Sequence, residues 1–406
     1  MKRSAVVRIA VTVVFLTVIA FGLKREFPAC VRAMRGERGI SVRKRIDVIR
    51  ETCLRKIPRR MELIGLNGWV VRMIGQHFCN DVVRMEGDFL AQPDVKRVSM
   101  GDAACNMRRF ADFCASNGVM FAYVQLPKKL DAGQSMLPPG YVDAAYANVD
   151  DLLADLKKLE VPFADWRQGF SATPADVWKN FYRTDHHWNT DAAFRATGLL
   201  AAEICTRCRI EPLMAADVRR VLSSERWERT IMPQIFMGSL ARRTGLGFAG
   251  CDDVVMMTPK FETELMFEVP DRHVKVTGSF RQTLMRRIDE LEKVDDPFDF
   301  DIYSLLYVGG IYPCSRSVNA RALLDLKILL IGDSYARPVS AFAATVVREL
   351  ILIDPRRRNP EDPSLVELIR REKPDVVIQM QSPSSLSSDR MTGRKTGRKI
   401  MFEYGF

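Results

Sequence analysis

Two adjacent histidines and one distant serine are the side chains of this sequence best suited to chemistry. The chain has four histidines, and His186 and His187 stand side by side directly after Asp185. Ser334 stands where a predicted strand ends and a predicted helix begins. A serine needs a base to become a nucleophile, and the pKa of histidine lies near neutrality. We predict that these stretches meet and form a Ser–His–Asp acyl-transfer site.

The three neighbouring residues at 185–187 are predicted to have unequal roles. Asp185 lies two residues before His187, and on an irregular loop its carboxylate can reach the ring nitrogen that faces away from the serine. That contact would fix the tautomer and stabilise the imidazolium. His186 would then point toward substrate or make a structural hydrogen bond. A metal ion bound by both histidines and a carboxylate, or a helix-capping role, is the alternative.

Ser334 follows an apolar strand pattern across the turn Gly332-Asp333. This turn would present the hydroxyl at the carboxyl edge of a sheet, where the next helix aims its first N–H groups. Such groups can stabilise an oxyanion. Asp333 could instead be an ordinary helix N-cap with Ser334 as its neighbour. We predict that His186, Lys128, Asp333 and Tyr335 are the residues that bind substrate or stabilise the oxyanion.

Alternating helix and strand patterns predict an α/β domain with a doubly wound, mostly parallel sheet. The run 118–127 is almost wholly apolar and ends at a proline, as a buried parallel strand does. Lys128 and Lys129 follow it, either at the ligand-binding edge of the sheet or on a solvated loop. The other predicted strands are 161–166, 326–331, 349–353 and 374–380, and the predicted helices are 103–117, 142–159, 191–210, 336–348 and 363–372.

The domain boundaries follow from these patterns. The α/β domain is predicted at 61–382, with a polar C-terminal tail at 383–406. Residues 67–70 indicate a turn into a strand. Scattered glycines and aromatic residues at 213–320 indicate an inserted region of loops and antiparallel strands that could wall the site.

The net charge of +11 comes from the N-terminal end. Residues 1–60 hold 16 Lys/Arg and 4 Asp/Glu, which leaves the other 346 residues with a net charge of −1. Basic residues beside an apolar segment favour anionic lipid headgroups as the partner. The sequence shows no basic groove with interleaved aromatic residues, so we predict no nucleic-acid partner.

Residues 5–23 are mostly apolar, with Arg8 as the only charged residue, and 19 residues is close to the length that spans a bilayer. A cleaved signal peptide is the alternative, because Ala20-Phe21-Gly22 resembles a cleavage site. We favour a single-pass anchor at 1–23, followed by a basic juxtamembrane stretch at 24–60. Basic residues flank both ends of the segment, so charge alone does not support an extracytoplasmic body. That orientation is inferred from the function proposed below.

Nine cysteines are dispersed along the chain, and Cys205 and Cys208 form the one close pair. A zinc site needs further ligands at short spacing, and none follow. The pair lies in a predicted helix, so we interpret both as ordinary helix residues, with a redox or metal role as the alternative. No cofactor is predicted.

The sequence Asp185-His186-His187-Trp188, preceded by Tyr182-Arg183-Thr184, resembles the signature of the DHHW protein family. That family is similar to the SGNH-hydrolase-like proteins of bacterial exopolysaccharide O-acetylation, including the alginate acetylation proteins. The resemblance covers about residues 65–382 and includes Leu126-Pro127-Lys128, Gly332-Asp333-Ser334 and Lys373-Pro374-Asp375.

Motif order adds to the resemblance, because the Asp–His pair precedes the serine as in the circularly permuted acetylation relatives. The resemblance implies an SGNH-hydrolase-like fold with Ser334 as nucleophile, His187 as base and Asp185 as orienting acid. The sequence departs from these relatives in two ways. It has no clear Gly and Asn blocks for further oxyanion donors, and the last strand ends in Met380-Gln381-Ser382.

The resemblance implies a membrane-anchored, extracytoplasmic O-acetyltransferase or esterase that acts on a cell-surface glycan. In the related systems a polytopic membrane acyltransferase supplies the acetyl group, so such a partner is implied here. One alternative is a non-catalytic glycan-binding or assembly component of an acetylation system. Another is a metal-dependent enzyme that uses His186 and His187.

Overall fold

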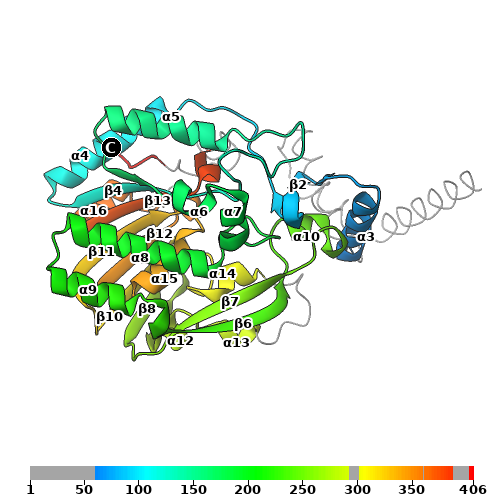
Figure 1. Ribbon diagram of the computed structural model, residues 1–406. Helices are drawn as coiled ribbons and strands as arrows, with labels where there is room; N and C mark the ends of the chain where they lie inside the picture. Colours follow the sequence, from blue (N-terminus) through cyan, green and yellow to red (C-terminus); the bar gives the residue numbers. More distant parts are fainter. Residues whose placement is uncertain (1–59, 292–300, 360, 387–401) are drawn as a thin grey trace, which may run out of the picture.

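A computed structural model describes residues 60–291, 301–359, 361–386 and 402–406 (Figure 1). The predicted anchor at 1–23 and the basic stretch, apart from its last residue, lie outside the described residues. Within the described ranges, no helix combines the length and the apolar character needed to cross a membrane.

An eight-stranded sheet forms the centre of the fold, in the order β5-β4-β13-β11-β12-β10-β8-β9. The strands from β5 to β12 are parallel, and β10, β8 and β9 continue the sheet in antiparallel pairing. This confirms the predicted α/β class with a mostly parallel sheet. The strands are β5 (Phe163–Asp165), β4 (Met120–Gln125), β13 (Val376–Gln381), β11 (Leu324–Gly332), β12 (Val347–Ile353), β10 (Cys314–Asn319), β8 (Leu265–Val269) and β9 (Val274–Gly278).

The central strands are mostly apolar because helices cover both faces of the sheet. Ile328 and Leu330 of β11 belong to one core cluster, and Leu329 and Ile331 belong to the other. The first face carries α8 (Thr190–Arg207), α9 (Pro212–Val221) and α15 (Ala336–Ala343), and the second carries α4 (Gly101–Ser116), α5 (Ala145–Lys158) and α16 (Leu365–Glu372). Figure 1 shows α4 and α5 on one side of the sheet and α8 and α9 on the other.

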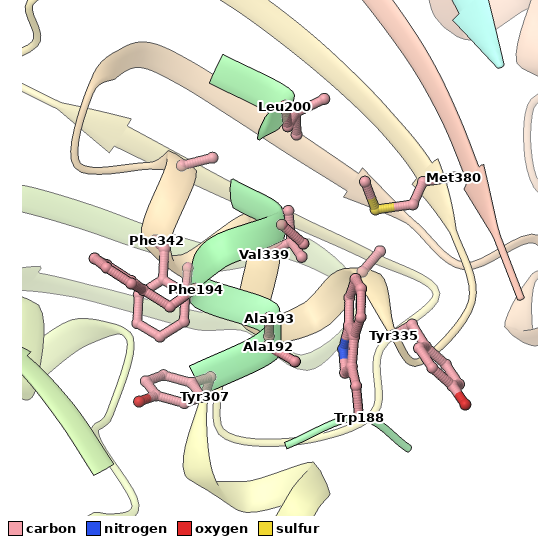
Figure 2. Packing of buried hydrophobic residues seen from close by; sticks show 14 of the residues in the cluster. Trp188, Ala192, Ala193, Phe194, Leu200, Tyr307, Tyr335, Val339, Phe342 and Met380 are labelled. Atoms are coloured by element: carbon pink, nitrogen blue, oxygen red, sulfur yellow. The ribbon is translucent and has the colours of Figure 1, made fainter. Parts of the chain in front are cut away.

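Helices α8 and α15 pack closely beneath the site. Figure 2 shows Ala192, Ala193 and Phe194 of α8 beside Val339 and Phe342 of α15. The small alanine side chains let the two helices approach, and Phe194 and Phe342 meet edge to face with ring centroids 5.2 Å apart. This packing fixes the start of α15, which follows the candidate nucleophile.

The region at 213–320 contains antiparallel strands that join the main body. A long ribbon pairs β6 (Trp227–Phe236) with β7 (Asp252–Pro259), and β8 to β10 extend the central sheet. The short helices α10 (Ala241–Thr244) and α11 (Leu246–Ala249) belong to the segment that connects the two ribbon strands. The remaining elements are β1 (Phe78–Cys79), β2 (Val82–Arg84), β3 (Leu90–Ala91), α6 (Arg167–Ser171), α7 (Pro174–Asn180), α12 (Phe280–Thr283), α13 (Ile288–Leu291) and α14 (Ile302–Leu306).

The predicted turn and strand at 67–70 is wrong, because α3 (Arg60–Met73) runs through these residues. Gly68 allows helix packing here. A Cβ atom at this position would lie 1.9 Å from the carbonyl oxygen of Thr244, at the end of α10. The glycine therefore lets α3 lie against α10, beside which it is seen in Figure 1.

The end of the chain is part of the core, although the sequence predicted a polar tail from residue 383. Phe402 and Tyr404 are buried. The Tyr404 ring stacks on Phe110 of α4 with centroids 3.9 Å apart, and its hydroxyl donates to Gln379 Oε1 at 2.7 Å. The domain therefore includes residues beyond the predicted boundary at 382.

Candidate active site

Ser334, His187 and Asp185 form a continuous hydrogen-bonded chain. His187 Nε2 lies 2.6 Å from Ser334 Oγ, and His187 Nδ1 lies 2.5 Å from Asp185 Oδ1. Ser334 follows β11, whereas the other two lie on the loop between α7 and α8. If Nδ1 donates to the carboxylate, Nε2 is free to accept the serine proton. The structure thus brings together the three residues selected from the sequence, and their catalytic role stays a prediction.

The turn that carries Ser334 depends on a glycine. A Cβ atom at Gly332 would lie 2.5 Å from the Cβ of Ala336 and 3.1 Å from the carbonyl oxygen of Met380. No larger side chain fits where β11 passes this close to α15 and β13. The turn therefore holds the serine at the carboxyl edge of the parallel strands, where open α/β sheets place their ligands.

Asp333 stabilises this turn by binding the segment that follows β13. Its Oδ2 accepts hydrogen bonds from Ser382 N at 2.9 Å, Ser382 Oγ at 2.6 Å and Ser385 Oγ at 2.7 Å. Burial raises the pKa of the Asp333 carboxyl, but attraction to Arg356 and these hydrogen bonds outweigh it, so the pKa is lowered. Asp333 is therefore an ionised hydrogen-bond acceptor.

The predicted role of Asp333 and Tyr335 in oxyanion binding needs correction. The N–H of Tyr335 donates to Asp333 Oδ1 at 3.0 Å, and the N–H of Ala336 donates to the Asp333 carbonyl. The Tyr335 hydroxyl donates to the carbonyl oxygen of His186. The Asp333 carboxylate can only accept hydrogen bonds. The N–H and the hydroxyl of Tyr335 both already donate within the protein. These two residues therefore order the turn and the loop instead of binding an oxyanion.

Lys128 is also engaged within the protein. Its ammonium group lies 2.7 Å from Asp94 Oδ2 and 2.5 Å from Asp143 Oδ2, and the lysine is buried. Two carboxylates therefore compensate its charge, and because the lysine also lines the groove beside the triad, its role in substrate binding stays a prediction. The predicted alternative of a solvated loop is wrong for this residue.

Aromatic rings and a backbone bridge hold the His187 ring in place. Tyr303 of α14 stacks on it, with ring centroids 3.7 Å apart and planes 10° from parallel. The Tyr303 hydroxyl also donates to the Ser334 carbonyl at 3.3 Å. Trp188 pairs with Phe181 to close the loop, and Figure 2 shows its ring beside that of Tyr335. These contacts restrict the ring to the plane in which Nε2 faces the serine.

The carboxylate of Asp185 has a second partner that the sequence did not reveal. Its Oδ2 accepts from the N–H of Ser239 at 2.6 Å, while Oδ1 accepts from the N–H of His187 at 3.0 Å. A Cβ atom at Gly238 would lie 2.4 Å from the Cβ of Asp185, so only glycine permits this approach. Burial opposes ionisation, but the two histidines and these N–H groups hold the pKa of Asp185 well below its usual range.

His186 is the more exposed member of the histidine pair. Its side chain is 43% exposed, against 8% for His187, and its Nδ1 lies 2.8 Å from Ser239 Oγ. Asp185, His186 and His187 place three ligand atoms within 4.8 Å of one another, so their spacing alone could suit a metal ion. A metal on His187 Nδ1 would have to separate it from the carboxylate 2.5 Å away. The same nitrogen cannot bind a metal and donate to Asp185.

A groove of about 530 Å³ lies beside the hydrogen-bonded chain. His186 and Tyr335 line it next to the triad, and Ser239 and Arg243 line it from the inserted region. Ser334 is 7% exposed and His187 is 6% exposed, so solvent has little access to either. The groove is therefore a candidate route by which a substrate reaches the serine.

Residues 86–241 match the family model of the SGNH hydrolase-like domain of acetyltransferase AlgX. The structure of PatB1 from Bacillus cereus superposes with a TM-score of 0.63 at 18% sequence identity, over 80% of this chain and 99% of the PatB1 chain. The fold is SGNH hydrolase-like. These matches confirm the resemblance found in the sequence, and at this identity the structural likeness shows the fold alone.

Two further structures share the SGNH-like fold. PatB1 with a sulfonyl adduct matches with a TM-score of 0.59 at 17% identity, over 78% of this chain and 97% of its own. A DHHW family protein from Eubacterium siraeum matches with a TM-score of 0.55 at 17% identity, over 79% of this chain and 95% of its own. No curated protein matches the sequence.

Proposed function

We propose that this SGNH-like domain is an extracytoplasmic O-acetyltransferase or esterase that acts on a cell-surface polysaccharide. The observation that carries the proposal is the hydrogen-bonded chain from Ser334 through His187 to Asp185. It contains a nucleophile, a base and an orienting acid in the geometry that acyl transfer needs. The match to an acetyltransferase domain supports acetyl as the acyl group. The sequence resemblance to the exopolysaccharide O-acetylation proteins supports a polysaccharide as the acceptor.

In the first half of the proposed reaction, Ser334 Oγ attacks the acetyl carbonyl while His187 Nε2 takes the serine proton. Asp185 stabilises the imidazolium through Nδ1–H. The tetrahedral intermediate collapses, the proton passes from His187 to the leaving oxygen, and the acetyl group stays on the serine. In the second half, His187 deprotonates a sugar hydroxyl or water, which attacks the acetyl-serine and releases Ser334 with its proton restored.

The acyl-enzyme can be tested directly. The full chain is incubated with p-nitrophenyl acetate, and separately with a sulfonyl fluoride, because a protein of the same fold is known with a sulfonyl adduct. We expect peptide mass spectrometry to locate both adducts on Ser334, and Ser334→Ala to acquire neither. Ser239→Ala, which removes the nearby hydroxyl bonded to His186, should still be labelled.

The non-catalytic alternative makes the opposite prediction. If no adduct forms on Ser334 and glycan binding survives both Ser334→Ala and His187→Ala, the chain is a binding or assembly component. Such a result would overturn the catalytic proposal and leave the assignment of the fold unchanged.

The proposal includes a membrane location and a polytopic acyltransferase that supplies the acetyl group. Residues 1–60 hold 16 basic and 4 acidic residues around an apolar segment, a composition suited to an anionic bilayer. Helix α3 follows directly and exposes Leu66, Trp69 and Met73. Its other side packs on α10 and α11 through Gly68. An exposed apolar helix face of this kind suits insertion into the lipid headgroup region.

Trp69 should therefore contact lipid. We expect brominated anionic vesicles to quench part of the tryptophan fluorescence of the full chain, and Trp69→Phe to remove most of the quenchable part. Trp178→Phe is the matched control, because Trp178 is similarly exposed on α7. Equal quenching in the wild type and Trp69→Phe would show that this face does not meet the bilayer.

A further inference from the structure

Lys129 is a buried lysine whose hydrogen-bond partners all belong to the loop that carries Asp185 and His187. Its Nζ donates to the carbonyl oxygens of Tyr182 at 3.0 Å and Arg183 at 2.9 Å, and to that of Asp185. An ammonium group has three protons to donate, and here three carbonyls accept them. The lysine is 3% exposed, so these bonds form out of water.

The same loop is held from its other side by a carboxylate. Asp252, at the start of β7, accepts from Arg183 N at 3.1 Å, Thr184 N at 2.7 Å and Thr184 Oγ1 at 2.6 Å. The loop lies outside the sheets, so its buried peptide groups need other partners. Lys129 binds the carbonyl groups and Asp252 binds the N–H groups, which fixes the loop backbone between two opposite charges.

Lys129 acts at the residue that orients the base. The carbonyl oxygen of Asp185 accepts from Lys129, and the carboxylate of the same residue accepts from His187 Nδ1. A shift of the Asp185 backbone would therefore move the carboxylate and change the position of the imidazole. Lys128, the neighbour in sequence, points away to Asp94 and Asp143 and makes no contact of this kind.

We propose that Lys129 is a positioning residue, whose ammonium group holds the loop backbone so that Asp185 and His187 activate Ser334. This inference rests on the proposed function of the triad. It assigns Lys129 no contact with substrate. The charged groups that face it are Asp185, Asp252 and Arg183. Burial lowers the pKa of Lys129 to about 7 despite the two carboxylates, because the charged form is costly out of water.

The test is chemical rescue of Lys129→Ala by a small amine. We expect the rate of Ser334 sulfonylation in this variant to fall about 10²-fold, the cost of a small misplacement of catalytic groups. Lys129 lines the groove, so ethylammonium can enter the space left by the side chain. Added ethylammonium should restore a large part of the rate, whereas ethanol, of similar size and without charge, should not. A wild-type rate in Lys129→Ala, or a loss that ethylammonium does not restore, would overturn the proposal.

Hydrogen exchange separates this proposal from the proposed function. The peptide 181–188 should exchange faster in Lys129→Ala than in the wild type, and ethylammonium should slow it again. Lys128→Ala is the matched control and should leave exchange of this peptide unchanged. If the wild type never reacts at Ser334, the proposed function fails, and exchange still decides the role of Lys129. Should Lys129→Ala not fold, Lys129→Met fills the space without the charge, and wild-type exchange in that variant would equally overturn the role.

Discussion

Replacing His187 by alanine is expected to lower the turnover of an acetyl ester about 10⁴- to 10⁶-fold, as the loss of a triad base does in serine hydrolases. His187 Nε2 is 2.6 Å from Ser334 Oγ, and removing the ring leaves the hydroxyl without a base. The serine would then have to attack in its protonated form. Steady-state hydrolysis of p-nitrophenyl acetate and single-turnover acetylation of Ser334 measure the effect.

The adjacent histidine provides a matched control. His186 Nδ1 contacts Ser239 Oγ, and its side chain is far more exposed than that of His187, whose Nε2 faces the serine. His186→Ala should therefore lower the turnover about tenfold or less, which corresponds to the loss of one ordinary hydrogen bond. Comparable losses in the two variants would contradict the unequal roles and favour a site in which both rings bind one ligand, such as a metal ion.

Much of the parallel sheet could be predicted from the sequence because its strands are buried on both faces. Strands β4, β11 and β13 are mostly apolar and lie next to a glycine or a proline, and that pattern depends only on local sequence. The prediction of a turn at Gly68 in α3 is wrong because Asn67-Gly68 has the composition of a turn. The true constraint on this glycine is the carbonyl of Thr244, far along the chain. No local pattern contains that information.

The three triad residues were identifiable because their types are scarce or their setting is distinctive. The chain has four histidines, and only His186 and His187 form an adjacent pair that directly follows an aspartate. Ser239 and Asp252 have no predicted role, and Lys129 is predicted only to lie at the ligand-binding edge or on a solvated loop. These residues bind backbone groups of the site or bind through their own backbone. Every residue has a carbonyl and nearly every one an N–H, so such partners leave no sequence signal.

Asp333 and Lys128 show how a charged residue at the edge of a sheet can be engaged within the protein. Both stand at the carboxyl end of a buried strand, which is where α/β proteins place ligand-binding residues. The structure gives Asp333 the hydroxyl groups of Ser382 and Ser385, and gives Lys128 two carboxylates. The position of a charged residue at such an edge therefore does not by itself show that the residue binds a ligand.

Asp185→Asn is expected to lower turnover about 10⁴-fold while leaving the fold intact, because an amide cannot keep the base in its working tautomer. Three N–H groups point at this side chain, from Ser239, from the His187 backbone and from the His187 ring. If the amide nitrogen of asparagine faces the ring, His187 Nδ1 must accept, and Nε2 then carries the proton. If the amide nitrogen faces Ser239, its N–H groups oppose the backbone N–H of Ser239. Either orientation disrupts the arrangement that activates Ser334.

The same substitution should change how stability depends on pH. The pKa of Asp185 in the folded protein lies well below its usual range, near 4 in an unfolded chain. Its charge therefore stabilises the fold above about pH 4, and this contribution is lost as pH falls toward the lower folded-state pKa. Asparagine does not ionise and makes no such contribution. The difference in unfolding free energy between wild type and Asp185→Asn should therefore narrow below about pH 4. Denaturant unfolding from pH 7 down to 3 measures it. A constant difference would mean that Asp185 is not an ionised partner of His187, and the triad would lose its orienting acid.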